Sequence, residues 1–217
     1  MKKLMVVLAM LLIATPAIAG SIIDSKHDLS SGSATTGPKA VAAGTNEVCV
    51  FCHTPHNAGA AGFAPLWNRT TINATAYYTG VQLDATITLA SVNASDAPLC
   101  LSCHDGASLT DALVNPPNVS ATPLSGVTNI ANANANLGTD LRNDHPVGFD
   151  YTAVETPADT GIDTQANAIG KVSGISFYNG GNDMWCSSCH DVHDPTNGSF
   201  LVTKNTASQL CLACHLK

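Results

Sequence analysis

The stretch Cys49-Val50-Phe51-Cys52-His53 decides how the rest of this chain is interpreted. A Cys-x-x-Cys-His run is the attachment signature of c-type haem, in which two thiols bind the porphyrin and the adjoining histidine binds the iron. The run occurs four times, and the other copies begin at Cys100, Cys186 and Cys211. The four copies use every cysteine of the chain, namely Cys49, Cys52, Cys100, Cys103, Cys186, Cys189, Cys211 and Cys214.

Two other uses of cysteine compete with haem attachment. Eight cysteines in a secreted chain could form disulfides, and Cys-x-x-Cys pairs also build zinc sites. Neither use explains why a histidine directly follows every second cysteine. We therefore predict four covalently attached c-type haems and keep disulfides and zinc as the alternatives.

The eight histidines of the chain divide into two equal sets. The histidines of the four runs are the predicted proximal iron ligands: His53, His104, His190 and His215. Four histidines remain for the opposite faces of the irons, and these are the predicted distal ligands: His27, His56, His145 and His193. Methionine is the competing axial ligand, but outside the N-terminal leader only Met184 is available. The sequence therefore predicts four haems with two histidine ligands each.

Residues 1–19 have the features of a secretory signal peptide. Lys2-Lys3 precedes an apolar run from Leu4 to Ile13, and Ala17-Ile18-Ala19 provides a small-residue cleavage site. The run is too short for a retained membrane span. We expect an exported mature chain, residues 20–217, that forms one tetrahaem cytochrome domain without a membrane span.

Composition narrows the possible functions. The formal net charge is −7, which argues against nucleic acid as a partner because nucleic-acid binding calls for a basic patch. Aromatic residues make up only 5% of the chain, so haem itself is expected to supply much of the core. No serine–histidine–aspartate constellation, phosphate-binding loop or metal-binding carboxylate cluster competes with the haem motifs.

The order of ligands repeats along the chain. Each of two modules, approximately residues 20–120 and 140–217, contains a distal histidine, a motif, a histidine three residues after that motif, and a second motif. This order predicts an internal duplication of a two-haem unit. The intervening sequence does not obviously repeat.

The histidines three residues after a motif have a geometric consequence. His56 is too close along the chain to His53 to reach the far face of the same haem, so it must bind a different iron. The same argument separates His193 from the iron of His190. Each such segment therefore holds two irons on one short stretch of backbone, which brings haems close enough for rapid electron hopping.

The remaining segments predict a fold that is mostly coil. Short helices are expected near Cys49, Ser187 and Ser208, where attachment motifs lie, and the alternation over Val81 to Leu89 favours a short strand or hairpin. The apolar cluster from Phe63 to Trp67 is expected to pack against a haem face.

Several segments resemble a known group of proteins. Residues Ser25 to Ser30, Cys49 to Asn57 and Ala64 to Asn68 resemble multihaem cytochromes of metal-reducing bacteria. Asp144 to Gly148 resembles the His-Pro distal-ligand segments of multihaem cytochromes. The ligand order and the size are similar to those of tetrahaem outer-surface cytochromes that polymerise into nanowire filaments. This resemblance implies a multihaem cytochrome c fold, mostly coil with short helices wrapped around a continuous stack of four haems. It also implies one distal histidine donated by a neighbouring subunit.

His27 is the candidate for the donated ligand because it lies close to the expected mature N-terminus, and terminal arms are mobile unless tied down. An arm that binds a neighbour's iron would produce an open head-to-tail homopolymer. In the alternative, His27 folds back and closes the His53 haem of its own chain.

The sequence is compatible with three functions. The first is electron transfer as a subunit of an extracellular or cell-surface filament, which would exchange electrons with other multihaem cytochromes and deliver them to external acceptors. The second is a soluble periplasmic tetrahaem shuttle. The third is a multihaem reductase, which needs an iron with one open coordination position; eight histidines for eight positions argue against it, so we expect no enzymatic activity.

Overall fold

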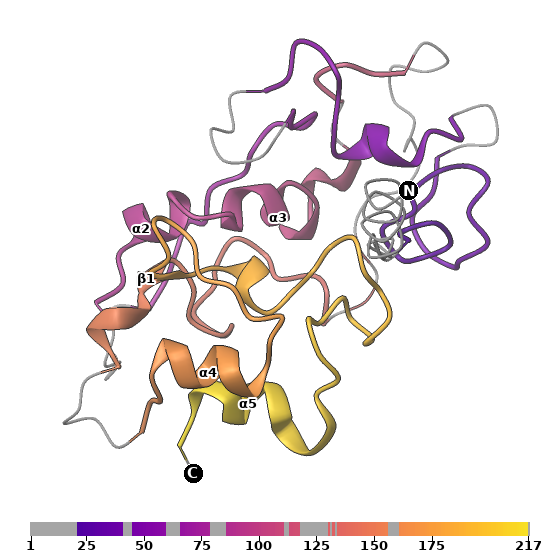
Figure 1. Ribbon diagram of the computed structural model, residues 1–217. Coiled ribbons are helices and arrows are strands. Elements are labelled where there is room, and N and C mark those ends of the chain that lie inside the picture. Colours follow the sequence, from indigo (N-terminus) through magenta and orange to yellow (C-terminus); the bar gives the residue numbers. More distant parts are fainter. Residues whose placement is uncertain are drawn as a thin grey trace, which may run out of the picture.

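The structure is a computed structural model that describes residues 21–40, 45–59, 66–78, 86–110, 113–117, 130, 132, 134–155 and 161–216. Most of these residues lie in turns and irregular coil, and the regular elements are short (Figure 1). The predicted signal peptide lies outside the described residues.

Local capping explains where several helices begin. The α-helices are α2 (Leu89–Asn93), α3 (Ala97–His104), α4 (Gln165–Lys171) and α5 (Gln209–Cys214). The Thr88 hydroxyl accepts a hydrogen bond from the Ser91 amide at the start of α2, and the Thr164 hydroxyl does the same for Asn167 in α4. The 3-10 helices are η1 (Val48–Phe51), η2 (Ser108–Thr110), η3 (Tyr151–Ala153), η4 (Cys186–Ser188) and η5 (Thr206–Ser208).

A small antiparallel sheet lies in the C-terminal part of the chain. Strand β1 (Phe149–Asp150) pairs with β2 (Asp183–Met184), with Phe149 opposite Met184. Both of these side chains are buried in a cluster that also contains Tyr151 and Val154. Met184, the alternative axial ligand, therefore contributes to the apolar packing of this cluster.

The apolar interior of the described chain is divided into four small clusters instead of one core. Attachment cysteines pack at the margins of each cluster. Cys52 and Cys103 contact the cluster around Phe51, and Cys189 and Cys214 contact the cluster around Tyr151. The clusters therefore surround the segments that the sequence assigns to haem.

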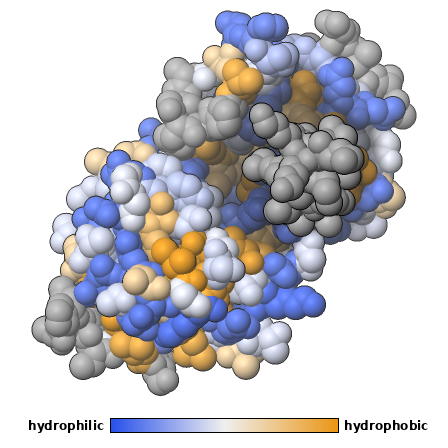
Figure 2. Space-filling model, in the orientation of Figure 1, coloured by the Kyte–Doolittle hydropathy of each residue, from blue (hydrophilic) through white to orange (hydrophobic). Residues whose placement is uncertain are grey.

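The chain folds into two halves that pack against each other. We call residues 21–117 the first half and residues 130–216 the second half. One apolar cluster combines Tyr77 and Leu101 of the first half with Leu141 of the second half. In Figure 1 the first half, indigo to magenta, occupies the upper part of the view, and α4 and α5 of the second half lie side by side in the lower part. Figure 2 shows polar and apolar side chains mixed over the visible face of both parts.

The predicted coil-rich fold with short helices is confirmed. Short helices are present near Cys49, Ser187 and Ser208, as η1, η4 and the η5–α5 pair. The described end of the expected hairpin differs from the prediction, because Leu89 begins helix α2, while residues 81–85 lie outside the described residues. Within the described part of the chain, every helix is too short or too polar to cross a membrane.

Candidate functional site

Each Cys-x-x-Cys-His run forms a single helical turn. The histidine amide donates to the carbonyl of the first cysteine of its run for His53 (2.8 Å), His190 (3.2 Å) and His215 (2.9 Å). His104 ends helix α3, which contains the whole second run. Positions one turn apart in a helix share a face, so the local backbone gathers both sulfurs and the imidazole of each run on one side.

The structure gives no support to the two alternatives for the cysteines. All eight thiols are free of disulfide bonds. A structural zinc site needs four converging ligands. Among the described residues, the one group of three or more metal-binding atoms within reach of one another is Asp96, Cys100 and Cys186. Burial raises the pKa of Cys52 to about 12 and that of Cys189 to about 11, so both thiols are protonated in the unmodified chain.

Three pairs of predicted iron ligands have their imidazole rings close together. The ring centroids are 6.1 Å apart for His27 and His104, 6.2 Å for His53 and His193, and 6.4 Å for His145 and His215. Each pair joins one histidine of an attachment run to one that follows or precedes a run. The sequence had separated His193 from the iron of His190, and the ring of His193 lies opposite His53.

These separations fit a shared metal ion. Two imidazole nitrogens on opposite sides of one ion, each about 2.1 Å from the ion and about 1.1 Å from its own ring centroid, place the centroids about 6.4 Å apart. The interplanar angles of 71°, 18° and 76° differ among the pairs. Rotation of a ring about the axis through the metal leaves the centroid separation unchanged, so all three angles are compatible with such ligation.

Backbone carbonyls orient several of these rings. The Nδ1 atom lies 2.6 Å from the Ala135 carbonyl oxygen in His104, 2.9 Å from the Pro146 oxygen in His145, and 3.0 Å from the Ser199 oxygen in His190. A proton on Nδ1 satisfies the carbonyl and leaves the Nε2 lone pair for a metal. The surroundings of these rings therefore favour the tautomer that iron ligation requires.

His27 is held inside its own chain. Its ring stacks on Phe200 with centroids 4.0 Å apart, and its Nδ1 lies 3.4 Å from the Val192 carbonyl oxygen. Burial, assisted by the neighbouring imidazoles of His104 and others, lowers the pKa of His27 to about 4 despite the Val192 carbonyl. A neutral imidazole is the metal-binding form. The sequence left His27 with a neighbouring subunit or with the His53 haem of its own chain. Within this single chain the ring lies beside His104, in contact with Phe200 and Val192.

His56 and His190 are the two predicted ligands without a ring partner among the contacts of the described residues. The ring of His56 is exposed, and the His56 carbonyl accepts hydrogen bonds from the Thr54 hydroxyl (3.0 Å) and from the Asn115 side chain (3.1 Å). Of the predicted apolar cluster from Phe63 to Trp67, residues 63–65 lie outside the described residues, and the Trp67 ring lies edge-on to His53 with centroids 6.0 Å apart.

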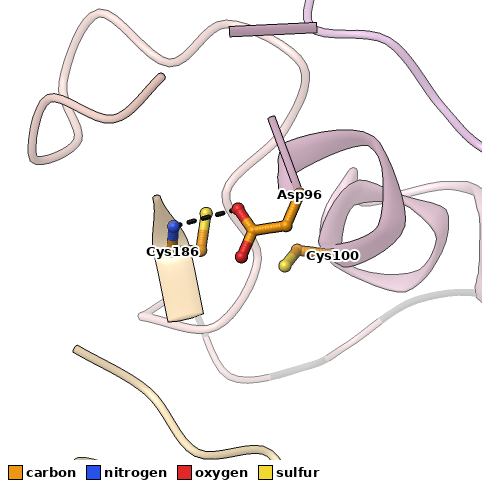
Figure 3. A group of neighbouring side chains, drawn as sticks. All are labelled: Asp96, Cys100 and Cys186. Carbon is orange, nitrogen blue, oxygen red and sulfur yellow. Dashed lines mark hydrogen bonds between the residues drawn. The ribbon is translucent and has the colours of Figure 1, made fainter. Parts of the chain in front are cut away.

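Attachment cysteines of different runs lie close together. Cys100 of the second run and Cys186 of the third run approach the carboxylate of Asp96, and one ligand atom of each residue lies within 4.8 Å of the others (Figure 3). Cys52 and Cys103 share one apolar cluster, and Cys189 and Cys214 share another. The runs are thus neighbours in the order first to second, second to third, and third to fourth.

Sequence reasoning missed two buried charged residues beside these runs. Asp96 begins helix α3, but its carboxylate accepts hydrogen bonds from the amides of Cys186 (3.0 Å) and Ser187 (2.8 Å). Arg69 donates to the carbonyl oxygens of Ser102 and Ser108 at 2.9 and 2.7 Å. No local motif marks either residue, so only the folded chain reveals them.

Comparison with known proteins defines the class of this site. The family described as the doubled CXXCH motif matches residues 179–217, which contain the third and fourth runs. No curated protein matches the chain. A doubled CXXCH motif indicates covalently bound c-type haem and a role in electron transfer. The match supports a multihaem c-type cytochrome, and this class implies export from the cytoplasm because c-type haem is attached after export.

Proposed function

We propose that the chain is a tetrahaem electron carrier in which each iron has two histidine ligands. The observation that carries this proposal is the set of three histidine pairs with centroids 6.1 to 6.4 Å apart. Each of the three pairs contains one motif histidine and one additional histidine. Eight histidines complete the eight axial positions of four irons.

The fourth pair follows from the other three. In each half the leading histidine lies beside the histidine of the trailing run, as His27–His104 and His145–His215. The leading run of the first half is closed by the second half, as His53–His193. His190 and His56 are the two remaining ligands, and by reciprocity with the His53–His193 pair we assign His56 to the iron of the third run.

The haem supplies the chemistry: each iron changes between ferric and ferrous by one electron. The chain holds the iron through two imidazoles and fixes their tautomers through backbone carbonyls. Two histidine ligands lower the reduction potential relative to a histidine–methionine pair. They also occupy both axial positions, so a substrate would have no position on the iron, and we propose electron transfer without an enzymatic reaction.

The contacts between runs support transfer within the chain. Neighbouring attachment sites join the first run to the second, the second to the third, and the third to the fourth. Electron tunnelling falls steeply with distance, so haems on such neighbouring runs would exchange electrons rapidly. We propose that electrons cross the protein along this connected group.

Intact-mass measurement and optical and EPR spectroscopy of the purified exported protein test the proposal. We expect a mass increase that corresponds to four haems and a spectrum of six-coordinate, low-spin iron only. Fewer haems would contradict the assignment of all four runs. A high-spin ferric signal in the wild type would contradict the paired ligands and favour the reductase hypothesis.

We further propose that the chain works as a subunit of an extracellular filament. The resemblance of the ligand order and the chain length to those of filament-forming tetrahaem cytochromes favours this assembly over a periplasmic shuttle. The His27–His104 contact within one chain is compatible with it, since a terminal segment can make the same contact with a neighbouring copy by domain swapping. Such an exchange would produce a head-to-tail homopolymer.

Electron microscopy of secreted wild-type protein and of a variant that lacks residues 21–40 tests the filament. We expect filaments in the wild type and small particles in the deletion variant. Small particles in both samples, together with one high-spin haem in the deletion variant alone, would mean that His27 serves its own chain and that the protein is a shuttle.

A further inference from the structure

Arg69 is a buried cation beside two attachment runs. Its side chain is 3% exposed, and its guanidinium donates to the backbone carbonyls of Ser102 (2.9 Å), Ser108 (2.7 Å) and Leu109 (3.2 Å). Its Nη1 atom is buried and has no hydrogen-bond partner among the described residues. Within the same part of the chain, no carboxylate forms an ion pair with this guanidinium. Among the described residues, backbone carbonyls are therefore the partners of this charge.

The charge of Arg69 acts on both the first and the second run. Arg69 follows Asn68, whose amide donates to the Cys52 carbonyl (2.8 Å), and Leu109, which accepts from the Arg69 guanidinium, belongs to the apolar cluster that Cys52 and Cys103 contact. These two cysteines pack on one apolar cluster. Arg69 thus lies at the junction between the first and second attachment sites.

Asp96 is a buried anion at the next junction. It is 7% exposed, and its two oxygens accept hydrogen bonds from the Cys186 amide (3.0 Å), the Ser187 amide (2.8 Å) and the Ser187 hydroxyl (2.5 Å). Figure 3 shows the carboxylate directed toward Cys100 and Cys186. Asp96 therefore joins the second run of the first half to the third run in the second half.

Other buried carboxylates differ from Asp96 in their surroundings. Asp163 forms an ion pair with Lys171 at 2.7 Å, so its charge is compensated. Asp28 bonds to Ser30 within its own turn and lies within reach of the charge of Lys39. Among the described residues, neither Arg69 nor Asp96 forms an ion pair with an oppositely charged group. Arg69 contacts the second run beside the cluster that Cys52 of the first run shares, and Asp96 contacts the third run beside Cys100 of the second.

We propose that the buried charges of Arg69 and Asp96 set different reduction potentials at successive haems. The inference rests on the proposed haem at each run. Oxidation adds one positive charge to a haem, and charges interact strongly in a buried, low-dielectric environment. Arg69 destabilises the ferric form and raises the potentials of the first and second haems. Asp96 stabilises the ferric form and lowers the potentials of the second and third haems.

The two charges together define a direction of electron transfer along the haems. Arg69 alone acts on the first haem, both residues act on the second, and Asp96 alone acts on the third. The potential therefore increases from the third haem through the second to the first. One electron that leaves the third haem converts its iron from ferrous to ferric, and the ferric iron of the first haem becomes ferrous when the electron arrives.

Site-resolved redox titration by NMR of the haem methyl signals tests the proposal on the full haem-loaded protein. We expect the Arg69→Gln variant to shift the first and second haems to lower potential, and the charge-conserving Arg69→Lys variant to stay near wild type. Asp96→Asn should shift the second and third haems upward, and Asp96→Glu should not. Arg142→Gln, which changes an exposed arginine, is the matched control and should leave all four potentials in place.

Three outcomes would overturn the inference. The first is unchanged potentials in Arg69→Gln and Asp96→Asn variants that carry four haems. The second is an equal shift in the charge-conserving and charge-removing variants, because the effect would then come from altered packing. The third, which requires no variant, is a wild-type third haem with a higher potential than the first. A haem count below four would instead contradict the proposed function, so the two failures are distinguishable.

Discussion

The two halves of the molecule place the same ligands on different backbones. In the first half, residues 54–99 separate the two runs, whereas in the second half only residues 191–210 do. Nevertheless, the leading histidine lies beside the trailing run in both, as His27–His104 and His145–His215. The family match covers residues 179–217, where the two runs are close together. The comparison teaches that the spatial relation of the ligands is retained while the connecting chain varies freely.

The halves also differ in whether a buried charged side chain has an oppositely charged partner. In the second half, Lys171 neutralises Asp163 at 2.7 Å. In the first half, the Arg69 guanidinium has only backbone carbonyls as partners among the described residues. Burying an uncompensated charge is costly, so its presence beside two attachment runs suggests a functional role. We infer that the first half, with its longer connections, carries the residues that adjust the haems.

Removal of a distal histidine is the largest expected effect and tests the equivalence of the halves directly. We expect His27→Ala to make the second haem high-spin, His145→Ala to do so for the fourth, and His193→Ala for the first. Each variant should lose the low-spin signal of that one haem, because the iron loses one of its two ligands. Site-assigned NMR and EPR measure this result.

The control for these variants is His56→Ala. Because we assign His56 to the iron of the third run, this variant should make the third haem high-spin. If His193→Ala opened the third haem instead of the first, the exchange of ligands between the halves would be wrong. If His27→Ala left every iron low-spin, the similarity between the leading histidines of the two halves would have no functional meaning.

Gly148→Ala should break the packing between the halves. Gly148 has a positive φ of 75°, and an added Cβ would lie 2.6 Å from the Val92 Cα atom in helix α2. Backbone strain and the clash together should cost about 3 kcal/mol of unfolding free energy. Urea unfolding of the haem-loaded protein measures the loss.

Gly180→Ala is the matched control, since Gly180 has a φ of 82° but open space around the added Cβ. Strain alone should cost about 1 kcal/mol there. Equal losses in the two glycine variants would mean that contact with α2 contributes nothing. A biphasic transition in Gly148→Ala would show that the halves can unfold separately.

The sequence predicted the residues that haem attachment requires, but not the contacts that depend on tertiary packing. The cysteines and motif histidines are predictable because haem attachment requires those residues at that spacing, and the family match over residues 179–217 supports two of the four runs. The coil-rich fold, which the connector-like segments and the resemblance predicted, is confirmed. The contact between His27 and His104 was not predicted, because Phe200 and Val192, which contact the His27 ring, are distant from it in sequence. The two-stranded sheet formed by Phe149–Asp150 and Asp183–Met184 also escaped prediction, since two-residue strands have no detectable alternation.

Asn68→Ala should destabilise the first half specifically. Asn68 is fully buried, its amide group donates to the carbonyls of Val50 (2.7 Å) and Asn115 (3.0 Å), and its oxygen accepts from the Asn115 amide (2.8 Å). Loss of these bonds leaves buried polar groups unsatisfied and should cost about 2 kcal/mol. Urea unfolding followed through the haem absorbance measures the change.

The exposed Asn46→Ala variant serves as the control and should lie within about 0.5 kcal/mol of wild type. Hydrogen exchange separates the halves further. We expect faster exchange in residues 45–59 and unchanged exchange in α4 and α5. Uniform acceleration over both halves would mean that Asn68 stabilises the molecule as one cooperative unit.

The smallest expected effect concerns the compensated ion pair of the second half. Hydrogen bonds from Lys171 and Asn167 lower the pKa of the Asp163 carboxyl from its usual 3.8 to about 2. Because the folded pKa lies below the unfolded value, the carboxylate contributes stability above about pH 4 and loses this contribution as the pH falls toward 2. Lys171→Gln removes the largest cause of the shift, so the variant should lose less stability than wild type between pH 5 and pH 2.5, as measured by urea midpoints. If wild type and variant lost equal stability over this pH range, the Lys171–Asp163 ion pair would contribute nothing to stability. Arg69 and Asp163 would then differ in where they lie and not in whether their charge is compensated.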